Sequence, residues 1–213
     1  MDSIACGELP ALFQAVSRVF EEKKDLLCGL DAKMGDGDLG LTMSKGFGAL
    51  PGLLRENMQQ DVGKTLMKAA MAMSSVVPST MGTLMASGIM EGGKALRGRT
   101  EINAAGLSVY LSGFEAGIRK RGKCETGDRT ILDAVAPAAG KAAALLAGQP
   151  SARPADVIGA AVQGAKAGVE ATKSMTPKFG KAAVFAARAI GVPDQGAVAA
   201  LAMLVGMRNY LCG

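Results

Sequence analysis

Residues 10–27 read PALFQAVSRVFEEKKDLL, and this stretch sets the helical pattern that recurs along the chain. Its apolar residues recur at intervals of three, four and seven, which is the spacing of one face of an α-helix. These residues are Leu12, Phe13, Val16, Val19, Phe20 and Leu27. Pro10 suits the first turn of a helix, where a missing N–H breaks no hydrogen bond. The stretch therefore predicts an amphipathic helix.

The same periodicity continues to the C-terminus, interrupted by loops rich in Gly and Pro. Further helices are predicted over residues 41–50, 61–75, 83–96, 103–119, 130–146, 154–171, 181–190 and 194–211. Asp61 and Asn103 suit N-cap positions, and Pro51-Gly52 predicts a helix end. No segment alternates convincingly like a strand, and no repeat or linker is visible. We expect one all-α domain over residues 1–213, an up-and-down arrangement of about eight helices.

Composition limits the chemistry that this chain can perform. Its 213 residues include no histidine, which excludes Ser-His and Cys-His catalytic pairs and His-ligated metals. The four cysteines show no CxxC spacing, so we expect reduced thiols in a cytoplasmic protein. The net charge of +5 is modest and its basic residues are scattered, so no nucleic-acid partner is expected. The longest apolar stretch, residues 197–207, is too short to span a membrane.

Three carboxylates lie within eight positions of one glycine-rich stretch, at Asp31, Asp36 and Asp38. Glycine permits the tight turns that bring such side chains together, and converging carboxylates repel one another unless a cation is present. Oxygen ligands alone favour Mg²⁺ or Ca²⁺. The spacing fails the EF-hand pattern, because Lys33 and Gly35 fall on ligand positions, so Mg²⁺ is favoured. The spacing is equally compatible with a plain polar turn.

Other segments are compatible with a phosphate ligand. Ser79 and Thr80 lie just before a predicted helix, where hydroxyls and amide groups bind anions or simply cap the helix. Residues 121–130 are charged and predict either a lid over a ligand or a solvated loop. Lys181 follows a glycine and either meets a phosphate or is an ordinary surface lysine. The sequence has neither a Walker A nor a GxGxxG motif, so a nucleotide site would be neither a P-loop nor a Rossmann site.

Four segments in order give a more specific pattern than any one of them. They are Leu30-Asp31-Ala32 with Gly35-Asp36-Gly37-Asp38-x-Gly40; a serine-containing loop with Gly82-Thr83; Gly127-Asp128-Arg129-Thr130-Ile131-Leu132-Asp133-Ala134 with Pro137; and Gly180-Lys181-Ala182-Ala183 leading to Asp194-Gln195-Gly196-Ala197. Together they resemble the nucleotide-binding L subunit of two-component dihydroxyacetone kinases, the DhaL or DAK2 domain family. The resemblance covers essentially the whole chain.

The resemblance implies a barrel of eight antiparallel helices and a site for ADP or ATP. It implies that Asp31, Asp36 and Asp38 hold two Mg²⁺ ions against the nucleotide's phosphates. Lys181 stands where the family has Arg and is the implied catalytic residue. The implied nucleotide contacts are Leu39, Gly40, Leu41, Thr42, Ser79, Thr80, Gly122, Ile131, Lys181, Asp194, Gln195 and Gly196.

The chain departs from the family pattern at Leu39, where the family usually has His, and at Gln195, where it has Pro. The loop before Gly82-Thr83 is also shorter. These differences indicate a divergent member, whose substrate the sequence does not fix.

The resemblance implies a kinase subunit that transfers a phosphoryl group to a ketose, which a histidine of a separate K subunit holds covalently. In some family systems a phosphotransferase-system protein rephosphorylates a bound ADP, whereas others use exchangeable ATP. The alternative is a non-catalytic ADP-binding regulator that signals through a transcription factor or another partner. A helical interaction protein with a polar turn is a third reading.

Overall fold

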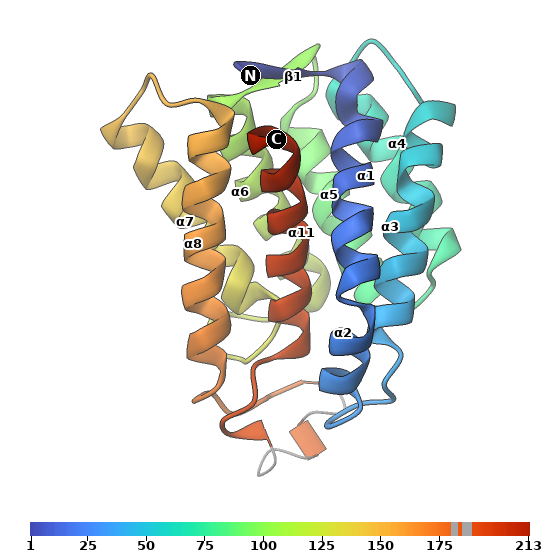
Figure 1. The fold of residues 1–213 in the computed structure, drawn as a ribbon, viewed down its shortest axis with the longest axis vertical. Coiled ribbons are helices and arrows are strands. Elements are labelled where there is room, and N and C mark those ends of the chain that lie inside the picture. The colour runs from blue at the N-terminus through green and yellow to red at the C-terminus, as the bar shows by residue number, and fades with distance from the viewer. Residues whose placement is uncertain (180–182, 185–188) are drawn as a thin grey trace.

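The computed structural model describes residues 1–179, 183–184 and 189–213, and this part of the chain is almost entirely helical (Figure 1). The helices are α1 (Leu9–Glu22), α2 (Lys24–Asp31), α3 (Leu39–Glu56), α4 (Val62–Val76), α5 (Thr80–Ala95), α6 (Ala104–Gly122), α7 (Leu132–Gly148), α8 (Pro154–Thr172) and α11 (Gln195–Cys212). A 3-10 turn, Cys6–Glu8, precedes α1. The all-α prediction is confirmed.

Eight helices of the described part form a closed ring in chain order. Each of α1, α3, α4, α5, α6, α7 and α8 packs against the next, and α11 packs against both α8 and α1. Helix α2 continues α1 after a break at Lys23 and packs against α3. Neighbouring helices of the ring run antiparallel, so the fold is an up-and-down helical barrel (Figure 1).

The core fills the ring with large apolar side chains from the predicted helix faces. Phe13 and Phe20 of α1 are buried, and the ring of Phe20 stacks on Phe47 of α3 with centroids 4.5 Å apart. Small residues let the helices approach closely. A Cβ atom at Gly168 of α8 would lie 2.0 Å from the carbonyl oxygen of Asp133 on α7. The high Ala and Gly content therefore reflects close helix packing.

Helix starts follow the sequence signals more closely than helix ends do. Asp61 and Asn103 cap α4 and α6, because their carboxylate and amide oxygens accept the backbone N–H groups of Lys64 and Gly106. The predicted end at Pro51 is wrong, because α3 continues through it to Glu56. Leu54, one turn beyond Leu50, is fully buried, and its packing favours the longer helix.

The structure differs from the sequence predictions in having two short strands near the N-terminus and before α6. The expectation of no strand is wrong, because β1 (Ser3–Ala5) and β2 (Glu101–Asn103) pair antiparallel, with Ile4 opposite Ile102. These strands are too short for a period-two pattern to be visible. The helix expected over residues 181–190 falls largely outside the described residues.

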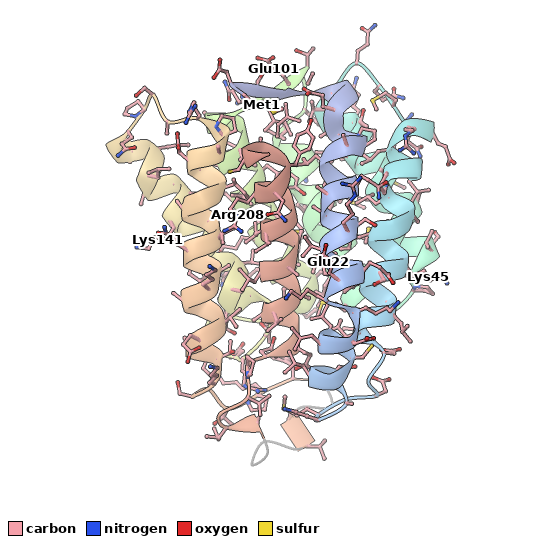
Figure 2. All side chains as sticks on the ribbon, in the orientation of Figure 1. Met1, Glu22, Lys45, Glu101, Lys141 and Arg208 are labelled. Carbon is pink, nitrogen blue, oxygen red and sulfur yellow. The ribbon has the colours of Figure 1, made fainter. Side chains whose placement is uncertain are left out.

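The two ends of the barrel differ. The N-terminus, β1 and the C-terminus lie at one end, and the loops that follow α2 and α8 lie at the other (Figure 1). Charged side chains such as Glu22, Lys45 and Lys141 stand on the outer surface (Figure 2). Within the part of the chain that the structure describes, no helix combines the length and apolar character needed to cross a membrane.

Candidate nucleotide and metal site

The three predicted aspartates converge at the loop between α2 and α3. Asp31 is the last residue of α2, Asp38 is the N-cap of α3, and Asp36 lies between them. One carboxylate oxygen from each lies within 4.8 Å of the other two. Asp31 is buried, whereas Asp36 and Asp38 are exposed. The loop therefore presents one anchored and two accessible carboxylates.

Backbone groups fold this loop around Asp31. Its Oδ2 accepts hydrogen bonds from the N–H groups of Gly37 at 2.9 Å and Asp38 at 3.1 Å. Gly37 has a φ of +79°, a conformation that favours glycine. A Cβ atom at Gly35 would lie 2.5 Å from Oδ1 of Asp31. Both glycines are therefore needed for the carboxylates to converge.

The donor set fits a hard divalent cation. Mg²⁺ binds oxygen ligands at about 2.0–2.1 Å in an octahedron, so its ligand atoms lie about 3–4 Å apart. Carboxylate oxygens within 4.8 Å of one another are close to that spacing. Because two of the three side chains are exposed, waters and ligand oxygens can fill the remaining positions.

A cleft of about 810 Å³ opens above the aspartates at the same end of the barrel. In an up-and-down ring every second helix begins at this end, and residues at the starts of α3, α5, α7 and α11 all line the cleft. Helix N-termini carry partial positive charge and unpaired N–H groups, which favour phosphate. The volume is in the range of small-molecule sites.

Most of the predicted contact residues line this cleft. They are Leu39, Thr42, Ser79, Thr80, Gly122, Ile131, Asp194, Gln195 and Gly196, together with Asp31, Asp36 and Asp38. Gly40 and Leu41 do not line it: Gly40 packs against the carbonyl of Lys24, and the side chain of Leu41 is exposed. Lys181 lies outside the described residues.

Gly40 and Leu41 present backbone N–H groups, rather than side chains, at this end of the barrel. They lie in the first turn of α3, where the N–H groups precede the first intrahelical hydrogen bond, from Thr42 to the carbonyl of Asp38. At α5, the side chain of Ser79 caps the helix by accepting the N–H of Gly82 at 3.0 Å. Ser79 can therefore cap the helix and bind an anion at the same time, because its hydroxyl oxygen accepts the Gly82 N–H while its hydroxyl proton stays available as a donor.

The loop before α7 contains a buried charge that sequence reasoning did not assign to the site. Arg129 is 2% exposed, has a φ of +59° and lines the cleft. Its guanidinium donates to the carbonyl oxygens of Thr172 at 3.1 Å, Ala189 at 3.1 Å and Val192 at 2.8 Å. Arg129 thereby joins the loop before α7 to the segment between α8 and α11. The solvated-loop reading is wrong for Asp128 and Arg129, because both are buried.

Asp194 is the buried carboxylate that faces this arginine. It caps α11 by accepting the N–H of Ala197 at 2.8 Å, and its own N–H donates to the hydroxyl of Thr172. Burial raises the pKa of Asp194 to about 6, although the Ala197 N–H and the charge of Arg129 act in the opposite direction. Burial also lowers the pKa of Arg129, and Asp194 opposes that change. Both residues contact Thr172, so the loop before α7 and the start of α11 meet at the end of α8.

Several apolar side chains complete the cleft and were likewise not predicted as site residues. They are Met34, Pro78, Met81, Leu84, Cys124 and Phe179. They come from segments far apart in the sequence, and no local pattern marks them as neighbours. An apolar wall beside a polar, anion-binding floor is typical of a site for a ligand with an apolar ring and a charged group.

Comparison with known proteins gives the same family as the sequence motifs. The DAK2 domain pattern matches residues 33–209. The chain belongs to the DAK2 domain family. It is 32% identical to the ADP-binding subunit DhaL of PEP-dependent dihydroxyacetone kinase 2 from Listeria innocua, over 92% of this chain and 89% of that protein. A DhaL subunit from Escherichia coli is 28% identical over 87% of this chain and 88% of that protein.

Longer proteins contain the same DAK2 unit. Human triokinase/FMN cyclase is 32% identical over 99% of this chain, which spans only 37% of that protein. The crystal structure of the dihydroxyacetone kinase from C. freundii in complex with AMP-PNP and Mg²⁺ superimposes with a TM-score of 0.70. That match covers 94% of this chain and 33% of the kinase chain at 24% identity, and it supports the fold. The DAK2 fold expected from the motifs is thus confirmed.

Proposed function

We propose that this DAK2 protein is the Mg–nucleotide-binding phosphotransferase subunit of a two-component kinase for dihydroxyacetone or a related ketose. The observation that carries the proposal is the position of Asp31, Asp36 and Asp38 below a cleft ringed by four helix N-termini. Carboxylates bind the cation and amide groups bind the phosphates, so one site accommodates both parts of a Mg–nucleotide. Relatives named as ADP-binding subunits support this reading.

The chain's own residues would orient the phosphates for transfer. The first-turn N–H groups of α3 and α5 face the cleft end, and Thr42, Ser79 and Thr80 add hydroxyls there. Bound Mg²⁺, which we propose to be two ions, would neutralise charge on the transferring phosphoryl group. Lys181, which stands in the place of a family arginine, would add a positive charge but could not make the bidentate hydrogen bonds of a guanidinium.

The phosphoryl acceptor would be held by a partner. Because the chain has no histidine, it cannot form the covalent histidine–ketose link that the family resemblance implies. We therefore propose a separate K subunit that presents the ketose to the open cleft. The phosphoryl donor would be either exchangeable ATP or a phosphotransferase-system protein that recharges bound ADP.

Binding of Mg–ADP tests the first half of this proposal. A ligand selective for the native state raises the melting temperature, by an amount set by its affinity. Mg–ADP should stabilise the wild type, and the double variant Asp36→Ala, Asp38→Ala should lose that effect. Both side chains are exposed, so the double variant should still fold. An unchanged thermal shift in the double variant would contradict the proposed site.

Phosphoryl transfer separates the kinase from the alternative, an ADP-binding regulator. With its K subunit and a phosphoryl donor, a catalytic subunit should produce ketose phosphate at a rate that depends on Asp36 and Asp38. Tight Mg–ADP binding without transfer to any ketose would favour the regulator instead.

A further inference from the structure

Gln195 places an amide group against the aspartate cluster. It is the first residue of α11, directly after the N-cap Asp194, and it lines the cleft. Its Nε2 lies 3.4 Å from Oδ1 of Asp31, which is a long hydrogen bond. Its Oε1 is buried and has no hydrogen-bond partner among the described residues. The Nε2 atom of Gln195 therefore contacts a proposed metal ligand, whereas its Oε1 atom lacks a hydrogen-bond donor among the described residues.

The position of Nε2 is suitable for a metal ligand. With Mg–O distances of about 2.0–2.1 Å, two ligand atoms lie about 3 Å apart when adjacent and about 4 Å apart when opposite. The 3.4 Å between this position and Oδ1 of Asp31 is slightly longer than the adjacent spacing, so a small rotation of the Gln195 side chain would bring its end atom into ligand range. The oxygen and nitrogen of a carboxamide are nearly the same size, so a half-turn of the group exchanges them.

The charge near Asp31 decides which atom occupies that position. Without a cation, the carboxylate attracts the N–H donor of Gln195, as observed. With a cation on Asp31, the carboxylate charge is compensated and an amide oxygen is favoured, because Gln carbonyl oxygens are ligands for hard cations. The half-turn would also give the unpaired Oε1 a partner. A buried acceptor left unpaired destabilises the protein.

We infer that Gln195 is a fourth protein ligand of the cation site and that its carboxamide turns when the cation binds. The inference rests on the cation site of the proposed function and adds a residue to it. Gln195 thereby couples the start of α11 to the loop between α2 and α3, because cation binding draws both segments to one ion.

The competing role is a structural one, in which Gln195 only donates a hydrogen bond to Asp31. The two roles predict opposite effects for Gln195→Met, which removes both amide atoms and keeps a similar length. If the amide oxygen binds the cation, its removal weakens Mg²⁺ binding. If the amide only donates, its removal frees Oδ1 of Asp31, and Mg²⁺ binding is unchanged or tighter.

Isothermal titration of Mg²⁺ into the protein without nucleotide measures the difference, because free ADP would itself bind Mg²⁺. We expect Gln195→Met to weaken Mg²⁺ binding about tenfold or more, as is typical for groups that support a metal site. Gln163→Met is the matched control, because Gln163 is exposed on α8 and does not line the cleft. Its Mg²⁺ affinity should equal that of the wild type.

Two further variants keep the test decisive. Gln195→Pro also removes the amide and suits the first position of a helix, so it serves if Gln195→Met fails to fold. Asp36→Asn tests the cation site itself and should abolish Mg²⁺ binding. Wild-type affinity in both Gln195 variants, with loss in Asp36→Asn, would overturn only the role of Gln195. Absence of Mg²⁺ binding by the wild type would overturn the cation site and this inference together.

Discussion

The pH dependence of stability provides a direct test of the buried carboxylate at the start of α11. Burial raises the pKa of Asp194 from an ordinary 3.8 to about 6. Between these values the folded protein keeps a proton that the unfolded chain has lost. Unfolding therefore releases a proton, and the free energy of unfolding falls as the pH rises from about 4 to about 6.

The size of this effect follows from the two pKa values. A rise of about two pH units corresponds to about 3 kcal/mol over the full range. About 2 kcal/mol of this falls between pH 4.5 and pH 7.5. Asp194→Asn should remove that slope. Asparagine caps helices about as well as aspartate, so the bond to the Ala197 N–H should persist. At pH 4.5 the folded Asp194 is already protonated, so the substitution changes the charge opposite Arg129 only at pH 7.5, and that interaction is already part of the pKa of about 6.

Urea unfolding at pH 4.5 and 7.5 would measure the slope in each protein. Asp61→Asn is the matched control, since Asp61 is also an N-cap. Burial raises the pKa of Asp61, but the N–H groups of Lys64 and Gly98 and the charge of Lys64 outweigh it and leave that pKa below its ordinary value. Its contribution is lost only below pH 4, so this variant should keep the wild-type slope. The reasoning is refuted if Asp194→Asn keeps that slope as well.

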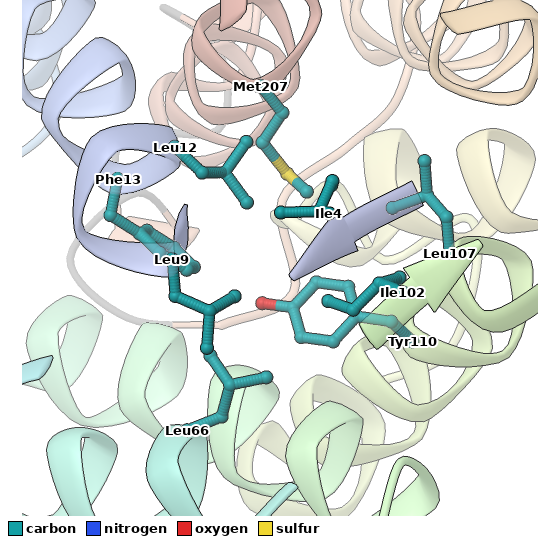
Figure 3. A pocket seen from close by; sticks show the side chains of 9 residues that line it. All are labelled: Ile4, Leu9, Leu12, Phe13, Leu66, Ile102, Leu107, Tyr110 and Met207. Atoms are coloured by element: carbon teal, nitrogen blue, oxygen red, sulfur yellow. The ribbon is translucent and has the colours of Figure 1, made fainter. Parts of the chain in front are cut away.

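Four other substitutions test the hydrogen bonding and packing of the barrel. Arg129→Met should reduce the free energy of unfolding by about 3–5 kcal/mol in urea titrations, because the carbonyl oxygens of Thr172, Ala189 and Val192 lose their guanidinium donor; a loss below about 1 kcal/mol would contradict this. Tyr110→Phe should be neutral or stabilise the protein by up to about 1 kcal/mol, because the Tyr110 hydroxyl is buried without a hydrogen-bond partner in the described structure. The hydroxyl lies beside an apolar cavity of about 10 Å³ (Figure 3). Clear destabilisation by this substitution would reveal a partner for the hydroxyl. Gly168→Ala should destabilise the protein by about 1–3 kcal/mol, because the new Cβ atom would clash with the Asp133 carbonyl oxygen. Gly159→Ala on the same helix places its Cβ atom with no other atom within 4 Å and should stabilise the protein by about 0.5–1 kcal/mol. Equal effects of the two substitutions would refute the close-packing argument.

The sequence predicted those features that depend on local spacing. Asp31, Asp36 and Asp38 lie within one loop, and their glycine spacers have the conformations that convergence requires. Helix faces and caps were predicted for the same reason. Pro51 shows the limit of local signals, because the packing of Leu54 overrides the tendency of proline to end a helix.

The sequence did not predict features that depend on distant contacts. In the sequence, Arg129 is one of several charged residues of a polar loop. Its partners, the carbonyl groups of Thr172 and Val192, are 43 and 63 positions away, so local patterns do not indicate these contacts. Only the closed ring brings these segments together. The orientation of Gln195 toward Asp31 spans 164 positions and has the same origin.

The topology of the barrel brings several helix N-termini together around the cleft. In a ring of antiparallel helices, alternate helices begin at the same end, so α3, α5, α7 and α11 present their N-termini to one cleft. This arrangement adds positive potential for phosphates to that of the basic side chains Arg121 and Arg129, which also line the cleft. The opposite end also has four helix N-termini, those of α1, α4, α6 and α8, but the aspartate cluster lies at the cleft end. A carboxylate cluster at the phosphate-binding end would weaken that attraction unless a cation intervened. The aspartates and the helix N-termini are therefore compatible as one site when divalent metal and nucleotide bind together, which predicts that ADP without Mg²⁺ binds weakly.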